Sequence, residues 1–163
     1  MDADNQTPAQ IGIGLAKSVG PWTFAADVAW RPATHYDLMR WKLDGEETEV
    51  EVHLKSVVDA SVGAEYLLAE KYPLRAGFFT AFSGTRRNEA EGEGNEVASS
   101  DVDMYGVTAS AGRRMGPMTV DVGLQYMWGR GTELGYTDGE GNMDWMPCRR
   151  DVVLCMISTT YLF

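Results

Sequence analysis

The sequence lacks the features that mark membrane helices and disulfide-rich or zinc-binding domains. It contains no apolar run of the roughly 18 residues that a membrane-spanning helix needs, which excludes a transmembrane helix. Its two cysteines, Cys148 and Cys155, would lie about 23 Å apart on one extended strand, too far for a disulfide. Cys155 is therefore interpreted as a small apolar residue, and no CxxC pair or His/Cys cluster indicates zinc.

Catalytic and cofactor motifs are also missing. The sequence has no nucleophile elbow, phosphate loop or HExxH motif. Asp59 and Asp121 fall on separate expected strands without a local His or Ser partner, and His53 stands alone, so paired-carboxylate catalysis and a metal role are disfavoured. The acidic stretches 89–96 and 138–142 lack EF-hand spacing and are interpreted as solvated loops. We therefore predict no enzyme, no cofactor and no metal site.

Positive charge is scarce. The formal net charge of the 163 residues is -10, which argues against nucleic acid as a partner, because phosphate binding needs a basic surface. The start, Met1-Asp2-Ala3-Asp4, has neither a basic nor an apolar region, so we expect no secretion signal within this sequence. The length and the hydrophobic content of 44% fit one domain.

What the sequence does contain is alternation with a period of two, which predicts an all-β protein. In 22–30, Trp22, Phe24, Val28 and Trp30 share one side, and the two tryptophans are about 26 Å apart, close to the roughly 25 Å apolar band of a bacterial outer-membrane barrel. The expected strands are 10–16, 22–30, 50–68, 74–83, 101–112, 118–128 and 150–163.

Short and long connections alternate along the chain. The long ones are the expected loops 31–49, 84–100 and 129–149, and turns of a few residues separate the other strands. This asymmetry is typical of outer-membrane barrels, which have short periplasmic turns and longer external loops.

Two hairpins have a register that suits both of their faces. The first pairs Val62 with Phe78, Ala64 with Ala76 and Glu65 with Arg75. The second is predicted to pair Tyr105 with Tyr126, Val107 with Leu124 and Ser110 with Asp121. Glu65 and Arg75 could guide a carboxylate ligand, but an ion pair that sets strand register is the favoured interpretation.

The two faces of these strands differ in chemistry. One collects large apolar side chains, with aromatics at its ends, and is predicted to face lipid; the other mixes glycine with charge and is predicted to line a water-filled lumen, because glycine on a solvent-exposed sheet surface weakens a strand. The predicted lipid-facing residues are Trp22, Phe24, Trp30, Val62, Phe78, Phe82, Leu124, Tyr126, Trp128, Tyr161 and Phe163. The predicted lumen-lining residues are Asp27, His53, Asp59, Glu65, Arg75, Asp121 and Gln125.

The expected fold is an antiparallel up-and-down transmembrane β-barrel, of which about seven strands are present as a single partial domain over 1–163. A bilayer does not tolerate an open sheet edge, because unpaired backbone groups cost several kcal/mol each. We therefore expect the chain to be the carboxy-terminal part of a larger barrel, completed by an amino-terminal half or by another chain.

Several segments carry a family resemblance. PAQIGIGLA and PWTFAADVAW, then VVDASVGAEYLLAEKYPLRAGFFTAFS, YGVTASAGRRMGPMTVDVGLQYMW and the final TTYLF resemble the carboxy-terminal half of the FadL-type long-chain fatty acid and aromatic hydrocarbon channels of the bacterial outer membrane. Leu162 departs from the basic or polar residue expected before the last aromatic.

The resemblance implies a barrel of about 14 strands, a plug formed by the amino-terminal part, and passive uptake of hydrophobic compounds without an energy source. The implied partners are membrane lipid and lipopolysaccharide and a hydrophobic small-molecule ligand. Two alternatives remain open: a structural or adhesive outer-membrane barrel without transport, and a soluble lipocalin-like barrel that binds a ligand inside.

Overall fold

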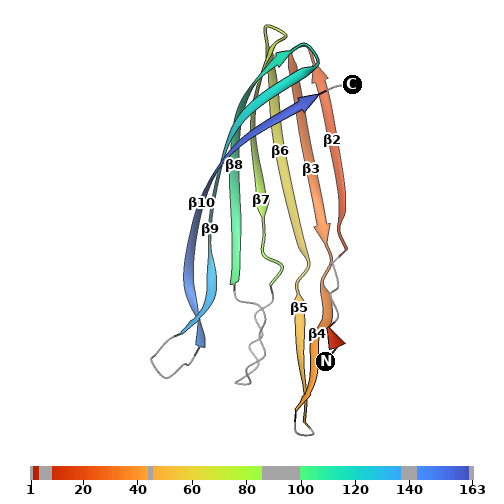
Figure 1. The fold of residues 1–163 in the computed structure, drawn as a ribbon, viewed down its shortest axis with the longest axis vertical. Helices are drawn as coiled ribbons and strands as arrows, with labels where there is room; N and C mark the ends of the chain where they lie inside the picture. Colours follow the sequence, from red (N-terminus) through yellow and green to blue (C-terminus); the bar gives the residue numbers. More distant parts are fainter. Residues whose placement is uncertain (1, 4–8, 44–45, 86–99, 137–142, 162–163) are drawn as a thin grey trace.

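The computed structural model describes residues 2–3, 9–43, 46–85, 100–136 and 143–161, with side chains described over 9–35, 54–85, 100–135 and 144–161. Almost all of these residues lie in antiparallel strands (Figure 1). The strands are β1 (Asp2–Ala3), β2 (Ile11–Val19), β3 (Trp22–Arg31), β4 (Thr34–Leu43), β5 (Glu46–Leu54), β6 (Val57–Leu68), β7 (Tyr72–Ala81), β8 (Ser100–Met115), β9 (Met118–Tyr136) and β10 (Met143–Tyr161). The all-β prediction is confirmed.

Seven strands form one sheet in the order β10-β9-β8-β7-β6-β3-β2, and every neighbouring pair is antiparallel. Strands β2 and β10 are the two edges of this sheet, which is not closed on itself. A three-stranded sheet in the order β1-β4-β5 continues from β3 and β6 (Figure 1). No helix within the described ranges is long and apolar enough to cross a membrane.

The tight turns lie at one end of the molecule, which we call the short-turn end, and the β4–β5 hairpin lies at the other, which we call the long-connection end (Figure 1). The β2–β3, β6–β7 and β8–β9 connections lie at the short-turn end, and the last described residues of β10 lie there as well. Gly20 and Gly116 adopt positive φ values of 56° and 62° in two of these turns, a conformation that glycine enters without steric penalty.

The sheet has almost no conventional core. Among the described side chains, the buried hydrophobic residues are Val57 and Val102, and the largest side chain that is fully buried is that of Pro73. A single sheet layer of this kind leaves both of its faces open, so stability must come from backbone pairing and from whatever covers the faces.

Segment 31–49 was predicted to be a loop, and this is wrong. It forms most of the hairpin of β4 and β5, with Leu43 paired to Glu46 across a two-residue connection and a register shift between Asp37 and Met39. The dipeptide Asp44-Gly45 is a common hairpin signal, but the many charged residues of the segment concealed it. Because β1 pairs with β4, this hairpin is part of the three-stranded sheet.

The single strand predicted for 50–68 is interrupted. Lys55 and Ser56 separate β5 from β6, and both form hydrogen bonds with neighbouring segments. The Lys55 backbone N donates to Gly84 O at 2.7 Å, and Ser56 Oγ accepts from Trp30 Nε1 at 2.8 Å. The unbroken alternation of the sequence does not report such a break, because each half keeps its own period of two.

The predicted loop 129–149 is also wrong, because β9 continues to Tyr136 and β10 begins at Met143. Gly129 and Gly131 lie where β8 comes close to β9. A Cβ added at Gly131 would lie 2.6 Å from Val102 Cα, and one at Gly129 would lie 2.9 Å from Met104 Cγ. Glycine at these positions permits the close approach without breaking the strand.

The two predicted hairpin registers have different outcomes. Val62 pairs with Phe78, Ala64 with Ala76 and Glu65 with Arg75, as predicted. In the β8–β9 hairpin Tyr105 pairs with Trp128, Val107 with Tyr126 and Ser110 with Gly123, so the predicted register is wrong by two residues. The strands continue to Met115 and Met118 around a tighter turn than 113–117, and a shift of two leaves each residue on its predicted face.

Candidate functional site

The seven-stranded sheet has one face that is strongly apolar, which we call the apolar face. It carries the large side chains that alternate along each strand, and most are well exposed; Leu15 is 78% and Ile157 79% exposed. The predicted lipid-facing residues Trp22, Phe24, Trp30, Val62, Phe78, Leu124, Tyr126 and Tyr161 are all exposed on it, and Phe82 and Trp128 are half-buried within it. Phe163 lies outside the described residues.

Aromatic rings gather near both ends of this apolar face. Next to the short turns, Trp22 lies 4.7 Å from Tyr66 and 5.8 Å from Phe24 between ring centroids. Toward the long connections, Tyr105 contacts Phe82 at 5.6 Å and Trp128 at 6.3 Å. Two aromatic rows therefore bound a band of aliphatic side chains.

The opposite face, which we call the groove face, contains an open groove of about 500 Å³. Small and polar side chains from β3, β6, β7, β8 and β9 border it, so the groove runs across most of the sheet. The residues that line it include Thr23, Asp27, Ser61, Gly63, Glu65, Arg75, Gly77, Phe79, Thr108, Ser110, Gly123 and Met156.

Three charged side chains meet on the groove face near the short-turn end. Arg75 Nε donates to Glu65 Oε2 at 2.7 Å, and Arg75 Nη1 donates to Asp121 Oδ1. A fourth, Arg114, places Nη2 3.9 Å from Glu65 Oε1. One guanidinium thus connects β6, β7 and β9, and its donors are directed at protein carboxylates instead of at the groove.

The absence of a side chain at Gly112 allows Asp121 to extend across β8 to Arg75. Asp121 pairs with Gly112 on β8, and its carboxylate lies over Gly112 on the way to Arg75. A Cβ at Gly112 would lie 2.9 Å from Asp121 Cγ, which is closer than side chains pack. The side chains of Asp27 and Phe79 lie over Gly14 and Gly106 in the same way.

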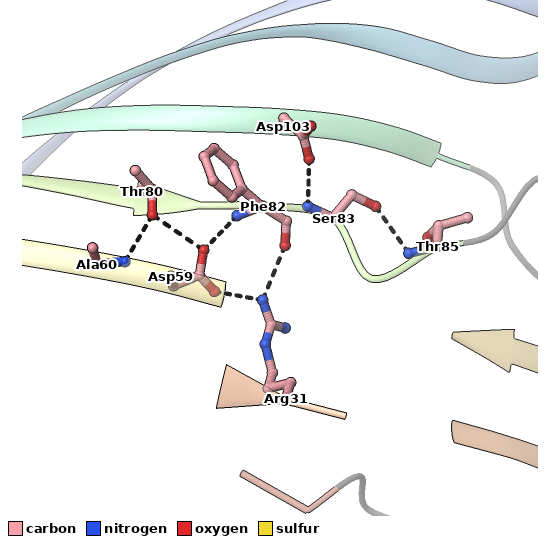
Figure 2. A network of polar contacts seen from close by, with 8 residues as sticks. All are labelled: Arg31, Asp59, Ala60, Thr80, Phe82, Ser83, Thr85 and Asp103. Atoms are coloured by element: carbon pink, nitrogen blue, oxygen red, sulfur yellow. Dashed lines mark hydrogen bonds and ion pairs between the residues drawn. The ribbon is translucent and has the colours of Figure 1, made fainter. Parts of the chain in front are cut away.

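A second polar cluster lies at the other end of the groove face, where β6 and β7 separate (Figure 2). Pairing of β6 with β7 stops at Ser61 with Phe79. The next bridge is an isolated one between Leu54, at the end of β5, and Thr85, beyond β7, and it is one residue out of step. Asp59 bridges the gap: Oδ1 accepts from the Phe82 backbone N at 2.8 Å, and Oδ2 accepts from Arg31 Nη2 at 2.6 Å.

Further bonds complete this cluster (Figure 2). Arg31 Nη2 also donates to Phe82 O at 2.9 Å, and the Ala60 backbone N donates to Thr80 Oγ1 at 2.9 Å. Side chains therefore satisfy backbone groups that a regular ladder would pair, so the strands separate here without leaving these groups unbonded.

The groove face also carries large apolar side chains that sequence reasoning did not weigh. Phe79 covers Gly106, Met104 covers Gly129, and Met156 reaches to within 4.0 Å of a Cβ built at Gly123. Met127, which pairs with Gly106, has the same parity along β9 as the groove residue Gly123. The sequence alone could have indicated these side chains, because alternation places Met104, Phe79 and Met127 on the same face as the charged residues.

Charged residues also lie on the apolar face at the long-connection end, with Asp151 opposite Trp128 of the aromatic row and Arg149 beyond it. Arg149 Nε donates to Asp151 Oδ2 at 2.8 Å, and Tyr126 Oη donates to Asp151 Oδ1 at 2.6 Å. On the neighbouring groove-face side, Cys148 Sγ donates to Glu133 Oε2 at 3.2 Å, and this bond raises the pKa of Cys148.

The structure places the predicted lumen-lining residues as follows. Asp27, Glu65 and Arg75 border the groove, Asp121 contacts Arg75, and Gln125 pairs with Thr108 on the same face. Asp59 belongs to the separate cluster with Arg31. The side chain of His53 lies outside the described ones. Asp59 and Asp121 therefore belong to different clusters, because Asp59 pairs with Arg31 and Asp121 pairs with Arg75.

Nothing among the described side chains forms a set of three or more metal-ligating groups, and both cysteines are free. The interactions described above are ion pairs, hydrogen bonds and apolar contacts. Comparison of the chain with family models, with curated protein sequences and with solved structures finds no match. The resemblance to FadL-type channels therefore stays a prediction.

Proposed function

We propose that this chain forms part of the wall of a bacterial outer-membrane β-barrel that lets neutral hydrophobic compounds enter passively. In this proposal the apolar face meets lipid, the groove face lines the lumen, and the long connections face outward. The chain performs no reaction and uses no cofactor.

The proposal rests on the burial pattern of the sheet, which is the reverse of that in a soluble protein: apolar side chains are exposed and a charged one is covered. Large aliphatic side chains such as Ile13, Leu15 and Ile157 are among the most exposed in the molecule, while charged Asp121 is largely covered. Covering one such aliphatic side chain is worth about 1.5–3 kcal/mol. A lipid environment bounded by two aromatic rows supplies that covering, whereas water does not.

The two free edges support a larger barrel. Strands β2 and β10 each pair on one side only, and each unpaired backbone group in hydrocarbon costs several kcal/mol. Partner strands that pair with β2 and β10 would remove both edges. These strands come from a longer form of this chain or from another chain.

The charges on the groove face favour a neutral ligand over a carboxylate. Each arginine described on that face has a carboxylate neighbour: Arg31 has Asp59, Arg75 has Glu65 and Asp121, Arg114 has Glu65, and Arg150 has Glu133. A fatty acid carboxylate would have to displace one of these protein carboxylates. Phe79 and the methionines offer an adaptable apolar surface instead.

The orientation of the two faces can be tested with thiol labelling in intact outer membranes. Cys155 lies on the apolar face, paired with Leu124, and the Cys148→Ser change leaves it as the single thiol. A membrane-impermeant maleimide should not label Cys155 until the membrane is dissolved, while Ser61→Cys on the groove face, in a cysteine-free background, should be labelled at once. Equal labelling of the two thiols in intact membranes would disprove the arrangement.

Transport can be tested with a pair of adjacent substitutions. Ser61 and Val62 both border the groove, but alternation places the Ser61 side chain on the groove face and the Val62 side chain, opposite Phe78, on the apolar face. Ser61→Trp should therefore obstruct the groove and Val62→Trp should not. Cells that produce each variant at equal outer-membrane levels are compared for uptake of a radiolabelled neutral hydrocarbon. The Ser61→Trp cells should take it up several-fold more slowly. Equal rates would leave a structural or adhesive barrel as the better description.

A further inference from the structure

Two arginines lie directly opposite each other on the apolar face. Arg130 on β9 pairs with Arg149 on β10, and both side chains are exposed. They follow Trp128 by one full alternation, which places them about 7 Å further toward the long-connection end. Like charges directly opposite on neighbouring strands are destabilising, so this pair needs a compensating anion.

The nearby carboxylates compensate the pair only in part. Asp151 is bound to Arg149 through Nε and Nη2 and also accepts from Tyr126. Asp103, which pairs with Arg130 from β8, accepts a bond from the Ser83 backbone N at 2.9 Å. Among the described residues, Arg130 has no hydrogen-bonded or ion-paired partner, and Asp151 interacts with it only through the longer-range attraction of opposite charges.

The two guanidinium groups border a concave site. A cavity of about 300 Å³ lies between them and the aromatic residues below, and its lining residues are Tyr126, Trp128, Gly129, Arg130 and Arg149. The site therefore has cationic donors on the outer side and aromatic rings on the inner side.

We propose that Arg130 and Arg149 bind the phosphomonoester group of a phosphorylated lipid headgroup in the outer leaflet. This inference rests on the proposed function, since it requires the apolar face to meet lipid. The planar guanidinium fork matches phosphate oxygens, and two opposed forks hold one dianion from both sides. The aromatic row marks the level where acyl chains end and headgroups begin, which is where the two arginines lie. The ion pair of Arg149 with Asp151 is exposed and therefore weak enough to rearrange around a phosphate.

The experiment measures lipid binding to the purified protein in dodecylmaltoside micelles by native mass spectrometry. The probes are lipid A with two phosphomonoesters, the same lipid stripped of both phosphates, and inorganic phosphate as a competitor. The unmodified protein should bind the phosphorylated lipid about tenfold more tightly than the stripped one. Inorganic phosphate should compete poorly, because it lacks the acyl chains that cover the rings.

Four variants, one of them a control, locate the binding. Arg130→Gln and Arg149→Gln should each weaken binding of the phosphorylated lipid about tenfold and leave the stripped lipid unaffected. Arg113→Gln is the matched control, because Arg113 is an exposed arginine of the same apolar face at the short-turn end, and it should change nothing. Arg130→Lys should give an intermediate loss, since a lysine keeps the charge without the fork.

Two outcomes would overturn the site. Equal affinity of the four variants for phosphorylated lipid would show that these arginines do not bind it. Displacement by inorganic phosphate at the concentration of the lipid would show a site for free anions only. The Cys155 labelling above reports separately whether the apolar face meets lipid, so failure of the phosphate site and failure of the proposed function are told apart.

Discussion

The contact between Gly112 and Asp121 gives the sharpest stability prediction. In Gly112→Ala the new Cβ would lie 2.9 Å from Asp121 Cγ and closer still to its carboxylate oxygen. The carboxylate must turn away, and its bond to Arg75 is lost. Gly12→Ala is the matched control, because the nearest atom to its Cβ is Val28 O at an ordinary 3.8 Å on the same face.

The magnitude follows from the exposure of the two partners. A hydrogen bond between charged groups contributes about 1.5–3 kcal/mol. The side chains of Arg75 and Asp121 are 39% and 13% exposed, and solvent screening places this bond at the lower end, about 1.5 kcal/mol. Replacing glycine by alanine in a strand returns about 0.5–1 kcal/mol. We therefore expect Gly112→Ala to destabilise by roughly 0.5–1 kcal/mol and Gly12→Ala to stabilise by about as much.

The assay is equilibrium unfolding in guanidinium chloride, followed by tryptophan fluorescence of the protein in detergent micelles. A double-mutant cycle isolates the mechanism. In an Asp121→Ala background the cost of Gly112→Ala should disappear, apart from a small strain against Pro73 Cγ at 3.1 Å. A full cost that persists in this background, or the same sign of effect for Gly112→Ala and Gly12→Ala, would refute the reasoning.

Two further predictions concern single side chains. Asp59→Ala should speed hydrogen exchange of the Phe82 amide, because it removes the acceptor of that N–H, whereas Asp59→Asn should protect it; equal exchange in both variants would contradict the role of Asp59. Glu133 raises the pKa of Cys148, so Glu133→Ala in a Cys155→Ser background should shift the pH profile of Cys148 alkylation to lower pH, and an unshifted profile would disprove the hydrogen bond.

The β6–β7 hairpin shows what could be predicted from the sequence. Val62, Phe78, Glu65 and Arg75 were paired correctly because the short turn 69–73 fixes the register and a single register suits both faces. The faces themselves follow from parity in an extended chain. They were therefore predicted correctly even in β8 and β9, where the register was wrong by two.

The sequence by itself determined which residues share a face, because alternation along an extended backbone leaves a side chain only two directions. Only the tertiary structure decided which residues meet across strands. Arg75 reaches Asp121 because Gly112 leaves room on the strand between them, and Asp59 meets Arg31 and Phe82 because β6 and β7 part at that level. Such contacts depend on twist, close approach and strand separation, which involve several strands at once and leave no period in any one of them.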